Sequence, residues 1–312
     1  MAEKIKITFL GTGSAIPTIT RNHSAIYFKY KNENILIDCG EGTQRQLRKA
    51  KINPCKITRL LITHLHGDHV FGIPGLFQTL NLNNYNKTLE IYGPKGIKRF
   101  IKDIFKTFNL TKAVKIKIKI TEISKSEEVS KLKLSEFLNV FETKDFTISA
   151  LPLEHGIPTL GYVFQEKNKL KINKQKLKKL NLSTKYNPKI AKLLKKKNIK
   201  IKNKTIRYQD LTYLEKARKI SIILDTKLCP NIKKLTKNSD LAIIESTSLD
   251  KTKYKHLTAE QAAQIAKQAK TKQLILTHIS QRYEFKENLL LKQAKKIFPN
   301  TKIAKDFMSV EV

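Results

Sequence analysis

The feature that most limits the fold of this chain is a cluster of metal-binding side chains directly after an apolar strand. Residues 60–69 read Leu-Leu-Ile-Thr-His-Leu-His-Gly-Asp-His, so three imidazoles and one carboxylate fall within six residues. Imidazole nitrogen and carboxylate oxygen are ligands that Zn²⁺ accepts. A loop that leaves a strand directs His64 and His66 to one point, and Asp68 and His69 to another, so the spacing predicts a site for two metal ions. The alternative is a solvated histidine cluster, and the position at a strand end, where active sites of α/β proteins lie, argues against it.

Further histidines and one aspartate extend this pattern in the rest of the chain. His155 follows a strand pattern at 146–153, Asp225 follows one at 220–224, His278 follows one at 274–277, and His256 lies in a polar turn. A single histidine after a strand is more often a satisfied core or surface residue. Two such histidines in a chain that also carries the loop at 64–69 reverse this expectation. We therefore expect His155 and His278 to join the site, with Asp225 as a carboxylate that bridges its two halves.

Strand and helix patterns repeat in two similar halves and predict an α/β fold. Strands are expected at 5–10, 25–30, 35–38, 60–63 and 89–92 in the first half and at 220–224, 241–245 and 274–277 in the second. Pro94 is expected at the first position of a helix that runs to about Phe108. From 165 to about 207, lysine, asparagine, leucine and isoleucine dominate, and the charge is too dense for a segment packed on both sides. The sequence thus predicts a single domain, 1–312, with a projecting basic arm inserted at 165–207.

The charge balance of the chain indicates a polyanionic partner. Lysine and arginine outnumber aspartate and glutamate by 62 to 26, which gives a formal charge of +36 and a pI near 10.0. This excess is far larger than solubility requires. The alternative is codon drift in an AT-rich genome, which would place lysine on solvated faces without a partner.

The cysteines and the apolar runs indicate where the chain resides. Cys39, Cys55 and Cys229 have no paired spacing, which is typical of a reducing compartment. No apolar run approaches the roughly 18 residues of a membrane span, and the first residues lack an export signal. The expected location is therefore the cytoplasm, or the stroma of an organelle such as a plastid if that organelle encodes the protein, with no membrane partner.

Several motifs together resemble one family, ribonuclease Z of the metallo-β-lactamase superfamily. They are Gly-Thr-Gly-Ser-Ala-Ile-Pro-Thr at 11–18, Ile-Asp-Cys-Gly-Glu-Gly-Thr-Gln at 37–44, the histidine loop at 63–69, Glu-His-Gly-Ile-Pro-Thr-Leu-Gly-Tyr at 154–162 and Thr-His-Ile-Ser-Gln-Arg-Tyr at 277–283. The histidine loop alone indicates only the superfamily, whereas the ordered set is specific and spans essentially the whole chain. The resemblance implies an αββα sandwich of two mixed sheets flanked by helices.

The resemblance also implies an activity and a set of ligands. The family implies a zinc-dependent endoribonuclease that removes the 3′ trailer from precursor tRNA and leaves a tRNA 3′-hydroxyl and a trailer 5′-phosphate. Two Zn²⁺ per subunit would be held by His64, His66 and His155 on one side, by Asp68, His69 and His278 on the other, and by Asp225 between them. The donor set accepts Mn²⁺ or Fe²⁺ as well.

Other roles follow from the same resemblance. Glu245 and His256 match the region that supplies a proton to the leaving oxygen, and Asp68 is a competing acid or base. Ser280, Arg282 and Tyr283 are expected to bind the substrate near the cut. Asp38 is expected to fix the histidine loop from behind.

The basic arm matches the place where the family carries an arm that grips tRNA, and the family implies a homodimer. The chain departs from the family at two places. Residues 183–189 read Ser-Thr-Lys-Tyr-Asn-Pro-Lys where relatives have a Gly-Pro-rich turn, and Ile19 occupies the position at which some relatives have a lysine used in sensing a CCA end. Arm lysines would bind phosphates without reading sequence.

Two other functions remain open at the level of sequence. A hydrolase of small phosphodiesters or sulfate esters would share the metal loop, but it needs no long basic arm. A catalytically inactive RNA-binding relative would keep the fold, but a complete set of seven ligands argues against the loss of catalysis.

Overall fold

A computed structural model describes residues 3–110, 115–124, 137–180, 188–201, 204–250 and 255–312 of the chain. It divides into two compact units. The larger unit consists of residues 1–142, 147–164 and 219–312, and the smaller unit of residues 143–146 and 165–218. All the predicted site residues belong to the larger unit.

The first sheet of the larger unit has seven strands and carries the histidine loop. Its order is β18 (Ser309–Glu311), β1 (Ile5–Gly11), β2 (Ala25–Tyr30), β3 (Glu33–Ile37), β4 (Arg59–Leu61), β5 (Thr88–Pro94) and β6 (Lys117–Ile123). The pairs from β18 to β3 are antiparallel and those from β3 to β6 are parallel. The parallel half places the carboxyl ends of β3 and β4 side by side, and both ends lead into the site.

The second sheet also has seven strands. Its order is β17 (Thr301–Ile303), β16 (Leu274–Thr277), β15 (Leu241–Glu245), β14 (Lys219–Ile223), β9 (Thr159–Glu166), β8 (Phe146–Leu153) and β7 (Leu138–Glu142). Strands β14 to β17 pair in parallel, and β7 and β8 are antiparallel. Asp225, Glu245 and His278 follow or end three neighbouring parallel strands and therefore gather at one edge of the sheet.

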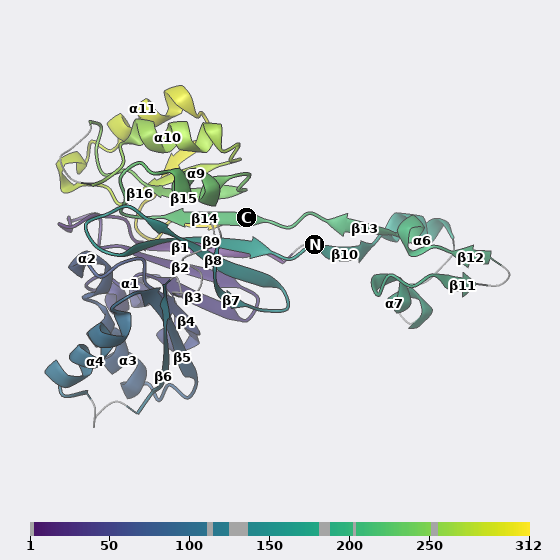
Figure 1. Ribbon diagram of the computed structural model, residues 1–312, viewed down its shortest axis with the longest axis horizontal. Coiled ribbons are helices and arrows are strands. Elements are labelled where there is room, and N and C mark those ends of the chain that lie inside the picture. Colours follow the sequence, from purple (N-terminus) through teal and green to yellow (C-terminus); the bar gives the residue numbers. More distant parts are fainter. Residues whose placement is uncertain (1–2, 111–114, 125–136, 181–187, 202–203, 251–254) are drawn as a thin grey trace. The chain divides into compact units, whose positions relative to one another are not determined.

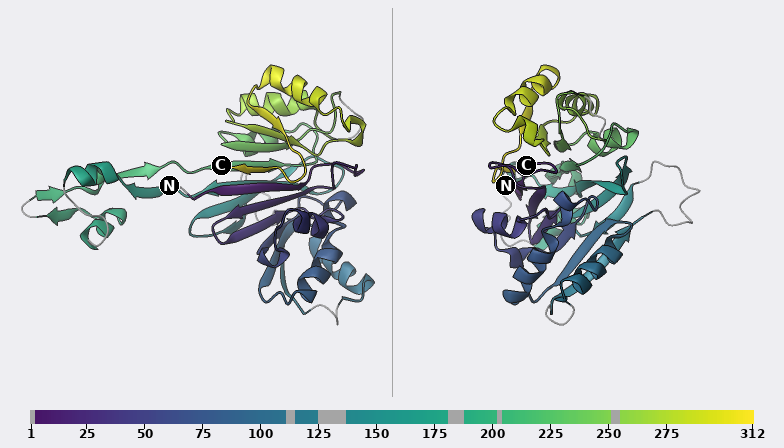
Figure 2. Two further views of the ribbon diagram at one scale, coloured as in Figure 1. Left: turned by 180° about the vertical axis from the view of Figure 1, so that it is seen from behind. Right: turned by 90° about the vertical axis from the view of Figure 1, so that its left-hand side faces the viewer.

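Helices cover the outer face of each sheet. Helices α1 (Thr43–Lys49), α3 (Ile73–Leu82) and α4 (Ile97–Thr107) pack on the first sheet, and α9 (Pro230–Thr236), α10 (Ala259–Gln268) and α11 (Asn288–Ile297) on the second. Figures 1 and 2 show these two helical layers on opposite sides of the paired sheets. The predicted sandwich of two mixed sheets flanked by helices is confirmed.

Aromatic side chains join the inner faces of the two sheets. The ring of Phe164 on β9 lies 4.9 Å from that of Phe28 and 5.4 Å from that of Tyr30, both on β2. Close to the site, the hydroxyl of Tyr162 donates to the carbonyl of Ile62 at 2.6 Å. These buried contacts hold β9 against β2 and against Ile62, which follows β4 and leads into the histidine loop.

The smaller unit has its own secondary structure and a small apolar core. It contains β10 (Lys169–Ile172), α6 (Lys174–Lys179), α7 (Pro188–Leu194), β11 (Ile199–Ile201), β12 (Lys204–Ile206), α8 (Tyr208–Leu211) and β13 (Thr212–Glu215). Leu177, Ile190, Leu193, Ile199 and Leu211 form its buried cluster. Strands β10 and β13 form an antiparallel stem in which Lys169 pairs with Glu215. Most of the turn at 183–189 lies outside the described residues.

One local prediction was wrong. Pro94 is the last residue of β5, where it pairs with Ile123, and the helix begins later, at Ile97. Gly96 separates the two with a φ of 103°, a left-handed conformation that glycine adopts without steric cost. No helix within the described residues is long and apolar enough to cross a membrane.

Candidate metal centre

The histidine loop is held in place by Asp38, which follows β3. Asp38 is fully buried, and its carboxylate accepts hydrogen bonds from the backbone nitrogen and the hydroxyl of Thr63, both at 2.7 Å. The same carboxylate lies 2.6 Å from Nδ1 of His69. Nearby, a Cβ on Gly40 would lie 2.4 Å from the carbonyl oxygen of Asp68, so only glycine allows this close approach. Asp38 thus fixes both ends of the loop.

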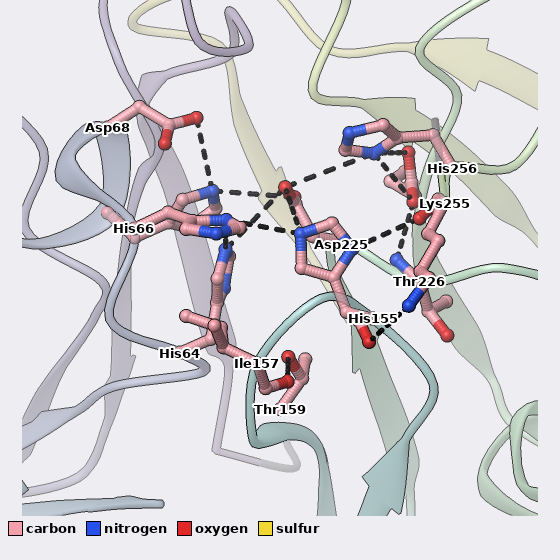
Figure 3. Close-up of polar contacts among 12 residues, drawn as sticks. His64, His66, Asp68, His155, Ile157, Thr159, Asp225, Thr226, Lys255 and His256 are labelled. Carbon is pink, nitrogen blue, oxygen red and sulfur yellow. Dashed lines mark hydrogen bonds and ion pairs between the residues drawn. The ribbon is translucent and has the colours of Figure 1, made fainter. Parts of the chain in front are cut away.

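The structure brings the seven predicted ligands together in two groups that share Asp225. Figure 3 shows His64, His66, Asp68, His155 and Asp225 among them. One group is His64, His66, His155 and Asp225, and the other is Asp68, His69, Asp225 and His278, and within each group the ligand atoms lie within 4.8 Å of one another. In the first group, Nδ1 of His66 is 3.1 Å from Nε2 of both His64 and His155. In the second, Nε2 of His278 is 3.3 Å from Nε2 of His69.

The two carboxylate oxygens of Asp225 face different groups. Oδ2 lies 3.6 Å from Nε2 of His64 and 3.8 Å from that of His155. Oδ1 lies 3.0 Å from Nε2 of His278 and 3.4 Å from that of His69. Oδ1 is buried and makes no hydrogen bond to any atom of the described residues. A buried carboxylate oxygen without a hydrogen-bond partner is costly unless a cation binds it, so this atom fits a bridging metal ligand.

Hydrogen bonds on the far side of the rings set the tautomers of four histidines. Nδ1 of His155 lies 3.1 Å from the carbonyl of Lys255, and Nδ1 of His69 faces Asp38, so each of these nitrogens carries the proton. The Thr63 hydroxyl donates to Asp38 and therefore accepts from Nδ1 of His64 at 3.0 Å.

The hydroxyl of Thr247 sets the tautomer of His278 in the same way. Its hydroxyl donates to Oε2 of Glu245 at 2.6 Å and lies 3.2 Å from Nδ1 of His278, from which it accepts. In its neutral form, each of the four histidines therefore presents an unprotonated Nε2 to the site, as a metal requires. His278 also has a φ of 59°, a conformation that is rare outside glycine and that turns its ring into the site.

The electrostatics of the groups favour a bound positive charge. Burial, followed by the neighbouring charge of His69, lowers the pKa of His64 to about 2. Burial opposes a charge on His69, but Asp225 and Asp38 outweigh it and raise the pKa of His69 well above its usual value. The surrounding imidazoles hold the pKa of Asp225 well below its usual range despite complete burial. The carboxylates therefore attract a cation, and a divalent metal suits the donors that face them.

A second pair of side chains lies beside the ligands. Nδ1 of His256 is 3.1 Å from Oε2 of the fully buried Glu245. Burial lowers the pKa of His256, but the hydrogen bond to Glu245 and its charge outweigh this effect and raise that pKa to about 9. The ring of His256 stacks on that of His278 at 5.6 Å. His256 therefore carries a proton at neutral pH next to the metal ligands.

The centre opens into a cavity of about 860 Å³, whose lining residues include members of both metal groups: His66, His155, Asp225, Asp68 and His278. Ser280 and Arg282 line it, but Tyr283 does not, and its hydroxyl instead accepts a hydrogen bond from the backbone of Leu249 at 3.0 Å. The structure thus places two of the three expected substrate-binding residues at the cavity. The cavity is also lined by Thr247, Lys255, Gln281, Phe71 and the 14–16 segment, to which the sequence patterns assigned no role at the site.

His23 is the one histidine of the chain that belongs neither to the metal groups nor to the pair with Glu245, and its side chain is buried. Its Nε2 lies 3.3 Å from the carbonyl oxygen of Ala15, in the segment that lines the cavity. The bridge between Gly13 and Ile279 ties the same segment to the His278 loop. His23 therefore supports the wall of the cavity and is not among the ligand groups.

Comparison with known proteins finds relatives over almost the whole chain. Ribonuclease Z of Methanothermobacter thermautotrophicus is 37% identical, and that of Enterococcus faecalis 38% identical, each over 99% of this chain and 97% of its own length. Human tRNase Z, short form, is a solved structure with a TM-score of 0.67 and 29% identity over 98% of both chains. The metallo-β-lactamase fold protein YhfI of Bacillus subtilis has a TM-score of 0.67 at 20% identity over 100% of both chains, a likeness of fold alone.

A family model described as Anti-Pycsar protein Apyc1 also matches residues 5–224. This segment contains the histidine loop and His155 but ends before Asp225 and His278. The fold and the two His/Asp groups together form a divalent-metal site. The chain therefore belongs to the family that this model describes and, by its full-length relatives, to the ribonuclease Z family.

Proposed function

We propose that this chain is a metal-dependent endoribonuclease that removes the 3′ trailer from precursor tRNA and leaves a tRNA 3′-hydroxyl and a trailer 5′-phosphate. The observation that carries this proposal is a complete set of seven ligands, arranged in two groups around Asp225, in a chain that matches ribonuclease Z proteins over 97% of their length. The complete ligand set also argues against an inactive RNA-binding relative.

The metal groups are proposed to hold two Zn²⁺ per subunit. His64, His66 and His155 would bind one ion, Asp68, His69 and His278 the other, and Asp225 both. Metal ions bound there supply the Lewis-acid chemistry that activates water and offsets the negative charge of the phosphate. Histidine and carboxylate donors also accept Mn²⁺ or Fe²⁺, so metal analysis must identify the ion.

We propose that His256 donates the proton that the leaving 3′ oxygen requires. Nδ1 of its ring is held by Glu245, so the proton available for transfer is on Nε2. Glu245 orients the ring and keeps it charged. Asp68 remains the competing acid or base, but it already lies 3.3 Å from Nε2 of His69 and 3.4 Å from that of His278, which suits a ligand better.

The smaller unit is proposed to be the basic arm that binds tRNA away from the cut. Residues 165–207 hold 17 lysines and arginines and a single acidic residue, Glu166. The lysines of α6 and the run from Lys195 to Lys197 are exposed around the apolar core of the unit. Such a surface binds phosphates without reading the base sequence. A homodimer, and location in the cytoplasm or an organelle stroma, stay predictions.

The test combines metal analysis with RNA cleavage. Protein purified without chelators is expected to carry two zinc ions per subunit and to cut a precursor tRNA once, at the trailer, and the same RNA without its T arm more slowly. His66→Ala is expected to abolish cleavage and to reduce bound metal. If neither RNA is cut while bis(p-nitrophenyl) phosphate is hydrolysed quickly, the chain is a small-ester hydrolase instead.

A further inference from the structure

An exposed aromatic ring lines the cavity into which the metal centre opens. Phe71 lines this cavity, together with His66 and Asp68, yet 66% of its surface is open to solvent. Ile16 lines the same cavity and is 53% exposed. Large apolar side chains exposed together beside a functional site indicate a surface that a ligand covers.

The ring of Phe71 packs against the start of its own helix. Phe71 ends the short helix α2 (Gly67–Val70), and its ring folds back over the first residue of that helix. A Cβ on Gly67 would lie only 2.2 Å from Cε2 and 2.5 Å from Cζ of the ring. The side of the ring that carries these atoms therefore lies against Gly67, and this contact lowers the side-chain entropy that binding to the exposed part would lose.

The cavity is larger than a phosphate group alone would need. Its volume of about 860 Å³ lies within the range of roughly 300–1,000 Å³ that accepts a whole small ligand. Its polar lining, with His256, Arg282 and the metal ligands, suits the phosphate, whereas Phe71 and Ile16 offer nothing to a charged group. The apolar part of the cavity therefore fits a flat, uncharged group attached to that phosphate.

We propose that Phe71 is a stacking platform for the base of a nucleotide joined to the scissile phosphate, with Ile16 contributing to the same apolar subsite. This inference rests on the proposed ribonuclease activity and adds a base-binding element to it. Stacking on an aromatic ring contributes about 1–3 kcal/mol per base and tolerates any base, because every base has a π-face. Phe71 would thus position the substrate at the cut without making the enzyme sequence-specific.

A double-mutant cycle between the protein and the RNA tests the contact. Precursor tRNAs are prepared with an abasic nucleotide directly before or directly after the cut, and kcat/KM is measured for wild type, Phe71→Ala and Phe71→Tyr. One abasic substitution is expected to slow the wild type about 5- to 150-fold, which is the stacking energy expressed as a rate ratio, and to slow Phe71→Ala little further. Phe71→Tyr keeps the ring and is expected to behave as wild type.

A fluorescence experiment gives a readout that does not depend on turnover. The chain contains no tryptophan, so Phe71→Trp introduces a single fluorophore at the subsite. Binding of tRNA is expected to quench this fluorescence, and the abasic RNA identified by the cycle is expected to quench it less. Phe108→Trp is the matched control, because Phe108 is a phenylalanine 53% exposed at the end of α4 that does not line the cavity.

The outcomes separate this inference from the proposed function. Additive losses in the cycle, or equal quenching at both tryptophan positions, would overturn the stacking role while leaving the ribonuclease intact. A change in sedimentation of Phe71→Ala, without coupling to either abasic RNA, would assign the ring to a contact between copies of the chain and would equally overturn it. If wild type fails to cut any precursor tRNA, the proposed function itself fails.

Discussion

At the scale of single residues, the chemistry of the centre depends on groups that touch the ligands from behind. Thr247 is the clearest case, because its hydroxyl joins the Glu245 carboxylate to the Nδ1 of the ligand His278. Partners of this kind set the tautomer and orientation of a metal-binding histidine, and their loss weakens metal binding about 10- to 100-fold.

Thr247→Val is therefore expected to weaken metal binding by about that factor, since valine matches the shape of threonine but cannot accept a hydrogen bond from Nδ1 of His278. Competition with a chromogenic chelator measures the affinity. Thr247→Ser keeps the hydroxyl and should bind metal like the wild type. Equal losses in the serine and valine variants would indicate a packing role for the methyl group and contradict the hydrogen-bond explanation.

The second residue-scale prediction concerns His256. His256→Ala is expected to lower kcat for precursor tRNA about 10²- to 10⁴-fold, because the leaving 3′ oxygen loses its proton donor. Hydrolysis of bis(p-nitrophenyl) phosphate should change far less, since p-nitrophenolate leaves without a proton. Equal loss of both activities, with bound metal unchanged, would reject the role as an acid.

The pH profile gives the same prediction an independent check. The carboxylate of Glu245 raises the pKa of His256, so the ring is charged at neutral pH. An acid acts in its protonated form, so the wild-type rate should fall as pH rises through that pKa. His256→Ala should lack this basic limb.

The sequence predicted ligands better than their supports. Seven donors could be proposed because histidine and aspartate after apolar strands are uncommon and their chemistry is specific. The role of Thr247 could not be predicted, because a threonine two residues past a strand has many ordinary uses. Its role depends on contact with His278, which follows another strand. Phe71 was missed for a different reason: whether a phenylalanine is exposed depends on the folded surface around it.

At the scale of elements, local patterns located the strands but not all of their ends. Strands β2, β8, β15 and β16 lie where the apolar runs predicted them. The helix expected from Pro94 begins three residues later, because pairing with β6 extends β5 through that proline. This pairing depends on the tertiary fold, and no pattern within the segment itself indicates it. The core of the smaller unit was likewise hidden in a lysine-rich sequence.

At the scale of elements, a deletion variant tests the proposed arm. The variant removes the arm and keeps the ends of the two strands from which it extends. Lys169 and Glu215 pair across β10 and β13, so a two-residue Asn-Gly turn can join them and replace residues 170–214. The ion pair between Glu166 and Arg218, at 2.9 Å, remains in the shortened stem. We expect kcat/KM for precursor tRNA to fall on the order of 100-fold and hydrolysis of the small diester to stay unchanged.

A charge variant separates the contribution of the lysines to tRNA cleavage from the contribution of the shape of the unit. Changing Lys195, Lys196 and Lys197 to glutamine leaves the buried cluster of the unit in place, because all three side chains are exposed. It should reproduce part of the loss in tRNA cleavage. If the deletion impairs both substrates equally, the unit supports the fold of the metal centre, and its assignment as a tRNA-binding arm is wrong.

At the scale of the whole molecule, the net charge of +36 bears on how RNA binding by the chain depends on salt. If the excess binds phosphates, tRNA binding releases counterions, and the logarithm of the association constant falls linearly with the logarithm of salt concentration. If it reflects only codon drift onto solvated faces, the slope stays small.

Binding of tRNA without a trailer, which cannot be cut, separates these cases when fluorescence anisotropy is followed from 50 to about 300 mM KCl. Each phosphate contact contributes about −0.7 to −0.9 to the slope, so the deletion of 170–214 should make the slope shallower by at least about two. The slope that remains then reports contacts made by the larger unit. An unchanged slope would mean that the lysines of the smaller unit do not contact RNA. The polyanionic partner would then have to bind to another surface of the molecule.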